Sequence, residues 1–350
     1  MSVGTRAEIA VRGVRVDAPV RRPAGAGPSD DGHLVVDGAN AALPVNPDSP
    51  YVVRDSRLWH GDVDTGLSVQ IVRRPRFYDL VTADGVRYEQ IARLHGADVL
   101  ASTVVQTCIR YAEEQRCRFC TIEESLRSGA TVAAKTPAQL AEVAEAAVRL
   151  DGVRQMVLTT GTTGGPDRGA RHLERCVRAI HAAVPALPIQ VQLEPPADLS
   201  VLTDLHRAGA VAVGIHVESL DDGVRRRWMP GKATVPMSAY LAAWDEAVRV
   251  FGRNRVSTYL LIGLGEDPDE LVAGAAALIE LGVYPFVVPF RPMMGTLARR
   301  DGVGAPAPAL VREVTERVAA LLRAAGMSGV DQQAGCAACG ACGVLRAAGG

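Results

Sequence analysis

Short runs rich in β-forming residues alternate with helical segments over most of the chain after residue 98. The β-rich runs cover residues 102–107, 155–160, 189–193, 211–217, 256–262 and 284–290. The helical segments that follow them cover residues 136–150, 169–184, 198–209, 238–252, 267–282 and 309–326. Six such β/α units predict a parallel sheet with helical crossovers, either an open doubly wound sheet or a closed or partial barrel.

The first 98 residues follow a different pattern. Residues 1–50 are rich in Gly, Pro, Asp and Ala, with short strand-like pieces such as "HLVVDG". "SVQIVRR" and "FYDLVTADGVRYEQI" suggest further short strands joined by an Asp-Gly turn. We therefore predict three parts: an N-terminal arm with a small β-rich module at 1–98, the β/α series at 99–328, and a cysteine tail at 329–350.

The segments just after the six predicted strands carry the candidate chemistry. In parallel barrels the working groups lie beyond the C-terminal ends of the strands. All six segments are polar, glycine-rich or sulfur-bearing: "CIRYAEEQRCRFC", "TTGTTGG", "EPP", "ESLDD", "GLGED" and "RPMMG". We expect them to line a single mouth.

Composition sets the compartment in which the cysteines act. The chain of 350 residues has seven cysteines, 48% hydrophobic residues, 22% charged residues and a net charge of -1. Charges scattered along the N-terminus argue against a signal peptide, and no run reaches the roughly 18 apolar residues of a membrane span. We expect a cytoplasmic protein without membrane or nucleic-acid partners, in which clustered cysteines are more often ligands than disulfides.

Cys108, Cys117 and Cys120 form the first cysteine group. Three thiolates can hold three irons of a [4Fe–4S] cluster and leave the fourth iron without a protein ligand. This loop, with Phe119 before the last cysteine, resembles the cluster loop of radical S-adenosylmethionine (SAM) enzymes. The usual spacing there is C-x3-C-x2-C, whereas this chain has C-x8-C-x2-C. A longer loop costs little closure entropy, about 0.6 kcal/mol per doubling of its length, so three ligands remain possible.

The resemblance implies a partial (β/α)6 TIM-like barrel that binds SAM at its strand ends. Thr160, Gly161 and Thr162 match the loop that receives the SAM amino group, although that motif's glutamate is missing. In "GIHVES", Glu218 and Ser219 would contact the ribose or the amino-acid part of SAM.

Further cofactor contacts are implied around the same mouth. Arg227 of "VRRRW" would meet the SAM carboxylate, unless it belongs to a solvated helix face. The adenine would lie near Phe119 and against a strand-end segment formed by Ile262, Gly263 and Gly265. Glu194 is either a contact to SAM or substrate or a polar strand end, and His216 either faces the mouth or is a packed histidine.

The second cysteine group is Cys336, Cys339 and Cys342 in "GCAACGACG". Its compact spacing with glycines suits a probable second, auxiliary [4Fe–4S] cluster. The alternative is a zinc site of two C-x2-C pairs made from Cys117, Cys120, Cys336 and Cys339, whose separation is far from the usual spacing. Cys176, at an apolar helix position, is expected to be core.

More narrowly, motifs along nearly the whole chain resemble radical SAM proteins encoded in bacterial nitrilase-containing gene clusters. These motifs include "KTPAQLAEVA", "QVQLEPP", "MPGKA", "GCAACGACG" and "GAGPSD" at residues 25–30. The expected function is oxygen-sensitive, reductive SAM cleavage to a 5′-deoxyadenosyl radical that abstracts hydrogen from a small nitrogen-containing metabolite, with an electron donor such as flavodoxin or ferredoxin. The alternatives are a sulfur-inserting synthase of lipoyl or biotin type, or a non-catalytic iron–sulfur electron-transfer or redox-sensing protein.

Overall fold

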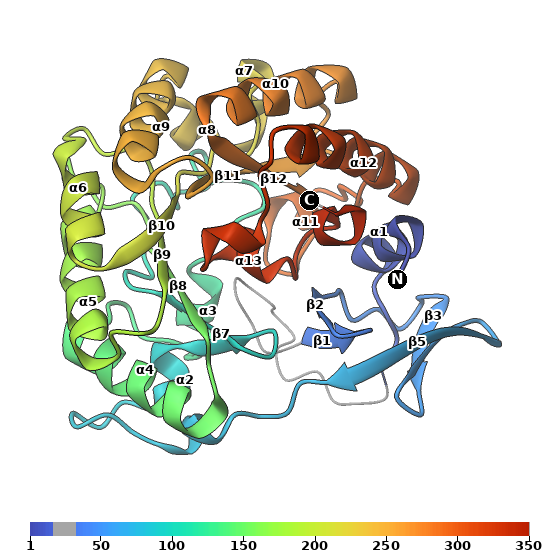
Figure 1. Cartoon of the computed structure of the whole chain (residues 1–350), viewed down its shortest axis with the longest axis horizontal. Helices are drawn as coiled ribbons and strands as arrows, with labels where there is room; N and C mark the ends of the chain where they lie inside the picture. The colour runs from blue at the N-terminus through green and yellow to red at the C-terminus, as the bar shows by residue number, and fades with distance from the viewer. Residues whose placement is uncertain (17–32, 350) are drawn as a thin grey trace.

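A curled, seven-stranded sheet forms the centre of the molecule, with helices on its outer face (Figure 1). The computed structural model describes residues 1–16 and 33–349, so the "GAGPSD" segment lies outside the described residues. The strand order is β12-β11-β10-β9-β8-β7-β6, and only β6 (Arg93–His95) runs antiparallel to its neighbour. The sheet is therefore a partial barrel whose two edge strands are β6 and β12.

The β/α series predicted from the sequence is confirmed. The six parallel strands are β7 (Val99–Thr103), β8 (Gln155–Thr159), β9 (Ile189–Gln192), β10 (Ala210–Gly214), β11 (Val256–Ile262) and β12 (Val283–Pro289). Five lie within one or two residues of expectation at their N-terminal ends. The first begins three residues earlier, at Val99, which pairs with His95 of β6 and Gln155 of β8, and it ends at Thr103 before the cysteine loop.

Helices cover the outer face of the barrel. Those that follow the strands are α4 (Pro137–Asp151), α5 (Ala170–Ala183), α6 (Ser200–Arg207), α9 (Met237–Phe251), α10 (Pro268–Leu281) and α12 (Pro308–Ala324). Local sequence sets the ends of α4: Thr136 and Gln139 form a capping box, Pro137 occupies the first turn, and Gly152 ends the helix in the left-handed conformation. Cys176 is fully buried in α5, as expected for a core residue.

Shorter helices carry the loops at the strand ends and in the N-terminal part. They are α2 (Tyr88–Ile91), α3 (Glu124–Arg127), α7 (Asp222–Trp228), α8 (Pro230–Ala233) and α11 (Leu297–Arg300), with the 3-10 helix η1 (Arg76–Asp79).

A separate antiparallel sheet lies beside the barrel in the order β2-β1-β5-β4-β3. Its strands are β1 (His33–Val36), β2 (Ala39–Ala42), β3 (Tyr51–Arg54), β4 (Arg57–His60) and β5 (Val63–Ile71). The expected small β-rich module is present, but two expectations inside the first 98 residues are wrong. The chain begins with a helix, α1 (Val3–Arg12), and "FYDLVTADGVRYEQI" forms η1, a single Val81–Arg87 bridge and α2 in place of strands.

The C-terminal tail packs between the barrel and the small sheet. It contains η2 (Val330–Gln332), α13 (Cys336–Cys339) and η3 (Leu345–Ala348), which Figure 1 shows near α1 and β2. Ala42 of β2 donates its backbone N–H to Ala341, and Cys339 packs with Val99 and Val157 at the barrel wall. The tail is thus part of the folded core, while the boundaries at residues 98 and 328 stay a prediction.

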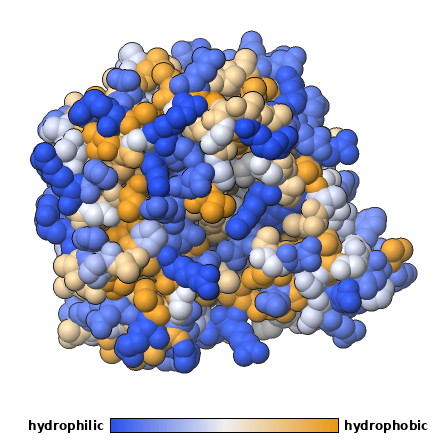
Figure 2. Space-filling model, viewed as in Figure 1, coloured by the Kyte–Doolittle hydropathy of each residue, from blue (hydrophilic) through white to orange (hydrophobic). Residues whose placement is uncertain are grey.

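The surface mixes polar and apolar residues. Figure 2 shows hydrophilic residues interspersed with smaller apolar areas on the face that Figure 1 presents. Within residues 1–16 and 33–349, none of the helices has the length and apolar character needed to cross a bilayer.

Candidate active site

The first cysteine loop leaves the end of β7 and lies across the mouth of the barrel. Cys108, Cys117 and Cys120 are free and partly buried. Two short backbone turns shape the loop, with Tyr111 N–H donating to Cys108 O at 3.0 Å and Cys120 N–H to Cys117 O at 2.9 Å. Between the first two cysteines a further turn is closed by the N–H groups of Gln115 and Arg116, which donate to Ala112 O at 2.9 and 2.8 Å.

The three thiols are close enough to act on one another's charge. Burial raises the pKa of the Cys117 thiol, Lys232 opposes this shift, and Cys120 and Cys108 add to it. Burial likewise raises the pKa of Cys120 to about 11, and Cys108 contributes. The described residues include no group of three or more His, Cys, Asp or Glu side chains that could hold one metal ion. Three thiolates on one loop could hold three irons of a [4Fe–4S] cluster.

The loop after β8 docks against the cysteine loop. Gly161 donates its N–H to Val105 O at 2.8 Å, and a Cβ at Gly161 would overlap the Thr107 carbonyl oxygen. Ile109 N–H donates to Thr162 O at 3.0 Å, and the Thr160 hydroxyl donates to Gly161 O. The glycine is needed here because the two backbones approach too closely for any side chain.

Glu194, at the end of β9, is engaged by the cysteine loop itself. Arg110 donates from Nη2 to Glu194 Oε1 at 2.6 Å and from Nε to Oε2 at 3.1 Å. The Thr162 hydroxyl donates to the same carboxylate at 2.8 Å. The side chains of Arg110 and Glu194 are only 11% and 3% exposed, so this bidentate pair anchors three strand-end segments to one another.

Glu218, beyond the end of β10, pairs with Lys232 at 2.5 Å. Its backbone has a φ of +62°, a conformation that non-glycine residues seldom adopt and that is often found at functional sites. Ser219 beside it is buried, and its hydroxyl accepts a bond from Asp221 N–H. Lys232 lies close enough to oppose the raised pKa of Cys117, so this ion pair borders the thiols.

His216 lies on the inner side of the barrel below Glu218. Its Nδ1 accepts the Tyr259 N–H at 3.2 Å, and its Nε2 is buried without a partner. Burial lowers its pKa to about 3, with Lys232 adding to the effect, so the imidazole is neutral at pH 7. The ring lies over Gly214, where a Cβ would overlap it.

The remaining predicted SAM contacts gather around the loop after β11. Arg227 Nη2 donates to Leu264 O and contacts the position that a Cβ on Gly265 would occupy. Gly263 and Gly265 have φ values of +102° and +101°, while Ile262 is buried. Phe119 packs in the same cluster of side chains as Leu264, with its ring stacked 6.5 Å from that of Trp228.

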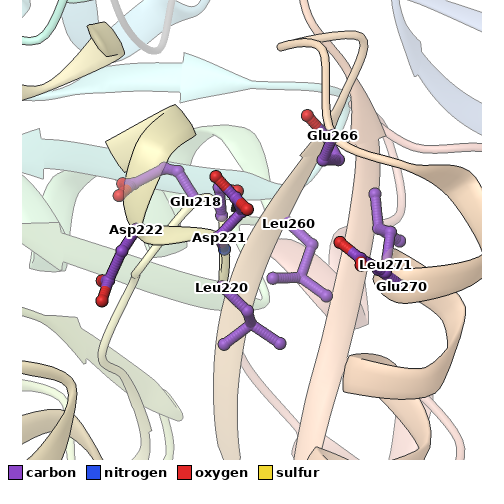
Figure 3. A pocket seen from close by; sticks show the side chains of 9 residues that line it. Glu218, Leu220, Asp221, Asp222, Leu260, Glu266, Glu270 and Leu271 are labelled. Atoms are coloured by element: carbon purple, nitrogen blue, oxygen red, sulfur yellow. Dashed lines mark hydrogen bonds between the residues drawn. The ribbon is translucent and has the colours of Figure 1, made fainter. Parts of the chain in front are cut away.

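A pocket of about 300 Å³ adjoins this region. Figure 3 shows the carboxylates of Asp221, Asp222, Glu266 and Glu270 around it, with Leu220, Leu260 and Leu271 forming apolar parts of the wall. Glu218 and Ser219 complete the lining, so two predicted contacts face this pocket. Both carboxylate oxygens of Glu266 are buried without a partner, and burial raises the pKa of this residue.

The second cysteine group lies at the tail and faces the barrel interior. Cys336, Cys339 and Cys342 are free. Burial raises the pKa of Cys336 and of Cys339, and the nearby Cys342 raises both further. Gln192 of β9 points its Nε2 at Cys336 Sγ at 3.2 Å. The two groups of three cysteines have different neighbours and form two separate sites. The alternative zinc site, which needs two cysteines from each group around one ion, is therefore not supported.

Buried donors and cations surround these tail thiols. Arg6 Nη1, His95 Nδ1, Arg291 Nε and Gln332 Nε2 are buried atoms without a hydrogen-bond partner. Three thiols, unpaired donors and two guanidiniums suit an anionic, sulfur-rich group such as a thiolate-held cluster. The residues present therefore fit a second cluster.

Several residues of both sites escaped the sequence analysis. At the mouth these are Arg110, Lys232 and Trp228; at the tail they are Arg6, His95, Gln192, Tyr259 and Arg291. Arg110, Lys232, Trp228, Gln192 and Arg291 lie inside quoted motifs, and Lys232 is one of only two lysines in the chain, yet none of these signals indicated a partner. The partners of these residues lie far away in sequence.

Comparisons with known proteins agree with the mouth geometry. The model for the "Radical SAM superfamily" matches residues 114–278, a range that contains Cys117 and Cys120 and begins after Cys108. The chain is 30% identical over 185 residues to lipoyl synthase of Halorhodospira halophila, which is 48% of this chain and 51% of that protein. It is 29% identical over 111 residues to bacteriochlorophyllide c C-7(1)-hydroxylase of Chlorobaculum limnaeum, 31% of this chain and 27% of that protein.

Among solved structures, the FeFe-hydrogenase maturase HydG of Carboxydothermus hydrogenoformans has a TM-score of 0.48 at 20% identity, over 65% of this chain and 50% of that chain. In the two sequence comparisons, the matched region spans about half the length of the lipoyl synthase and about a quarter of the length of the hydroxylase. Residues 114–278 form a domain of the radical SAM superfamily.

Proposed function

We propose that the chain is a radical SAM enzyme that acts on a small molecule inside the barrel. The observation that carries this proposal is the group of three free thiols at the mouth, in which Cys108 and Cys120 act on the pKa of Cys117, bordered by the Lys232–Glu218 pair in a radical SAM domain. When bound, a reduced [4Fe–4S] cluster and SAM supply a 5′-deoxyadenosyl radical, which removes a hydrogen atom from a substrate.

The chain's own residues hold and shield this chemistry. Cys108, Cys117 and Cys120 would ligate the first cluster, and the Arg110–Glu194 pair fixes their loop over the strand ends. The glycines after β11 allow close backbone approach to a flat ring, and Phe119 packs beside them.

The test is 5′-deoxyadenosine formation, measured by mass spectrometry on anaerobically reconstituted protein with SAM and dithionite. Wild type is expected to form it and Cys117→Ala to lose it. Cys176→Ala is the matched control, because this thiol is buried in α5 away from both sites. Product from neither wild type nor variant, despite a full iron content and a reducible cluster, would support the electron-transfer or sensing alternative.

We infer that Cys336, Cys339 and Cys342 hold a second [4Fe–4S] cluster. The unpaired donors and cations around them support this assignment. The likeness to lipoyl synthase favours one second candidate function, in which the tail cluster supplies sulfur for insertion into the substrate. Loss of tail-site sulfide during turnover would distinguish that synthase from an enzyme that keeps its second cluster.

The finer assignments rest on the sequence motifs. The likeness to radical SAM proteins of nitrilase-containing gene clusters supports a small nitrogen-containing substrate. Oxygen sensitivity and a cytoplasmic electron donor such as flavodoxin or ferredoxin go with the proposed clusters. To identify the substrate, deuterated candidate metabolites are incubated with the enzyme. Transfer of deuterium from a candidate into 5′-deoxyadenosine would identify that candidate as the substrate.

A further inference from the structure

Two cations next to the mouth thiols are neutralised by carboxylates. Arg110 pairs with Glu194 at 2.6 Å, and Lys232 pairs with Glu218 at 2.5 Å. Both pairs are largely buried, so each contributes little net charge to the thiols beside it. A further carboxylate, Glu123, accepts the N–H of Cys108 at 3.3 Å. The guanidinium of Arg116, the residue before Cys117, lies over the Tyr111 ring, 5.0 Å from its centroid.

The cations next to the tail thiols are not neutralised in this way. Arg6 is 3% exposed, and its bonds go to backbone carbonyls, Ala341 O at 2.6 Å and Gly343 O at 3.2 Å. Arg291 Nη2 donates to Cys342 O at 3.1 Å. Among the ion pairs of the described residues neither guanidinium has a carboxylate partner. Among the described residues, Asp98 acts on the Cys339 thiol, and its carboxylate accepts a bond from Asn40.

Neutral donors also point at the tail sulfurs. Gln192 Nε2 lies 3.2 Å from Cys336 Sγ, and the Tyr259 hydroxyl hydrogen-bonds with the same thiol. His95 Nε2 lies 3.9 Å from Cys342 Sγ. Hydrogen bonds to the sulfurs and the net charge of the surroundings are two of the features that set the potential of an iron–sulfur cluster.

From this contrast we propose that the tail site holds its cluster at a higher reduction potential than the mouth site, with Arg6 and Arg291 as the residues that set the difference. Reduction adds one negative charge to a cluster. The two guanidiniums without carboxylate partners and the two donors directed at Cys336, from Gln192 and Tyr259, stabilise that charge at the tail, whereas Arg110 and Lys232 at the mouth are already paired. The tail cluster is thus the site where an added electron comes to rest. This inference rests on the proposed second cluster.

The first test compares the two sites in full-length protein. One variant carries Cys108→Ala, Cys117→Ala and Cys120→Ala and keeps the tail site; the other carries Cys336→Ala, Cys339→Ala and Cys342→Ala and keeps the mouth site. Both are reconstituted anaerobically, and iron and sulfide are counted. A redox titration followed by electron paramagnetic resonance is expected to show the tail cluster reduced first, at the higher potential. The same order is expected for the two signals of wild type.

The second test removes the cations one at a time. Arg291→Gln and Arg6→Gln in the tail-only protein are each expected to lower the ratio of reduced to oxidised cluster about tenfold at a fixed applied potential. Arg291→Lys should restore most of the ratio, because it keeps the charge. Arg12→Gln is the matched control, since Arg12 lies on α1 with Arg6 but pairs with Glu8 at the surface.

The possible results distinguish failure of the inference about reduction potential from failure of the second cluster or of the radical SAM assignment. Tail iron that is reduced at the same or a lower potential than mouth iron would overturn the inference while leaving both clusters in place. Full iron content with an unchanged ratio in both arginine variants would do the same. A tail-only protein without iron would overturn the second cluster, and the inference with it, while the mouth-only protein still tests the radical SAM assignment.

Discussion

Glu194 shows how a single side chain ties the mouth together. Its carboxylate accepts bonds from Arg110 and Thr162, so it holds the cysteine loop and the loop after β8. The sequence identified it only as a possible cofactor contact or a polar strand end. The ion pair adds a structural role, because Arg110 would otherwise be a buried charge without a partner.

Glu194→Gln is expected to lower the free energy of unfolding by about 3 kcal/mol, since it leaves Arg110 with a buried, uncompensated charge. Denaturant unfolding of iron-free protein measures this. Glu113→Gln is the control: it breaks the pair with Arg300, in which the side chains are 56% and 61% exposed, and should cost less than about 1 kcal/mol. Equal losses in the two variants would show that burial of the pair does not matter.

Lys135 is a second residue whose burial has a measurable consequence. Its ammonium donates to Thr103 O at 2.6 Å and Gln106 Oε1 at 3.0 Å, and Gln106 Nε2 in turn donates to Ile122 O. Burial lowers the pKa of Lys135 to about 7 from its ordinary value of 10.5. This lysine therefore supports the base of the cysteine loop, but burial disfavours its charged form in the folded protein.

The pH dependence follows from that shift. Between about pH 7 and 10 the unfolded chain binds the Lys135 proton and the folded chain does not, so wild type gains stability as pH rises through this window. Lys135→Met lacks this gain. Its free energy of unfolding minus that of wild type should fall by up to about 1.4 kcal/mol per pH unit between pH 7 and 9 and stay constant below pH 6. Parallel curves from pH 7 to 9 would contradict the buried-lysine assignment.

At the scale of elements, the parallel barrel was predictable and parts of the N-terminal region were not. Five of the six parallel strands begin close to their predicted positions, because each is a short run rich in Val, Ile, Leu, Thr or Tyr that lies between helical segments. α1 was missed because its buried face is built from small alanines and the buried Arg6, which weakens the apolar periodicity. A buried arginine makes sense only once the tail carbonyls it binds are in place.

The segment after β5 was misassigned for a related reason. Phe77 and Tyr78 favour strands by propensity, yet both are buried in the main core from a 3-10 turn. The Asp151 carboxylate accepts the N–H groups of Arg76 and Phe77, each at 2.9 Å. A cap supplied from the end of α4 leaves no local signal. The same holds at the site, where the partners of Glu194 come from distant loops.

The contact between two loops gives a prediction at this scale. Gly161→Ala is expected to push the loop after β8 away from the cysteine loop, because its Cβ would overlap Thr107 O. The cost should be about 2 kcal/mol of unfolding free energy, together with lower iron content in the mouth-only protein. Gly164→Ala is the control, since its nearest new neighbour is Ile109 at 4.0 Å. Similar iron contents in both variants would argue against this contact as a support for the ligands.

For the whole molecule, the tail joins parts that the sequence keeps far apart. It meets β2 through Ala341, β8 through the Gln155 side chain that accepts the Gly335 N–H at 2.9 Å, and α1 through Arg6. These contacts place Cys336 opposite Gln192 inside the barrel. The tail therefore has a packing role in addition to its three thiols.

Deletion of residues 329–350 separates these two roles. It should reduce bound iron from about eight atoms per chain to about four and also destabilise the iron-free protein, because Val99 and Val157 lose the cover of Cys339 and Ala341. Cys336→Ala, Cys339→Ala and Cys342→Ala together should lose the same iron with a smaller loss of stability, since the tail backbone remains. Hydrogen exchange should then rise in α1 and at the start of β7 in the deletion only. If deletion and cysteine substitution destabilise the iron-free protein equally, the tail contributes ligands alone and the barrel closes without it.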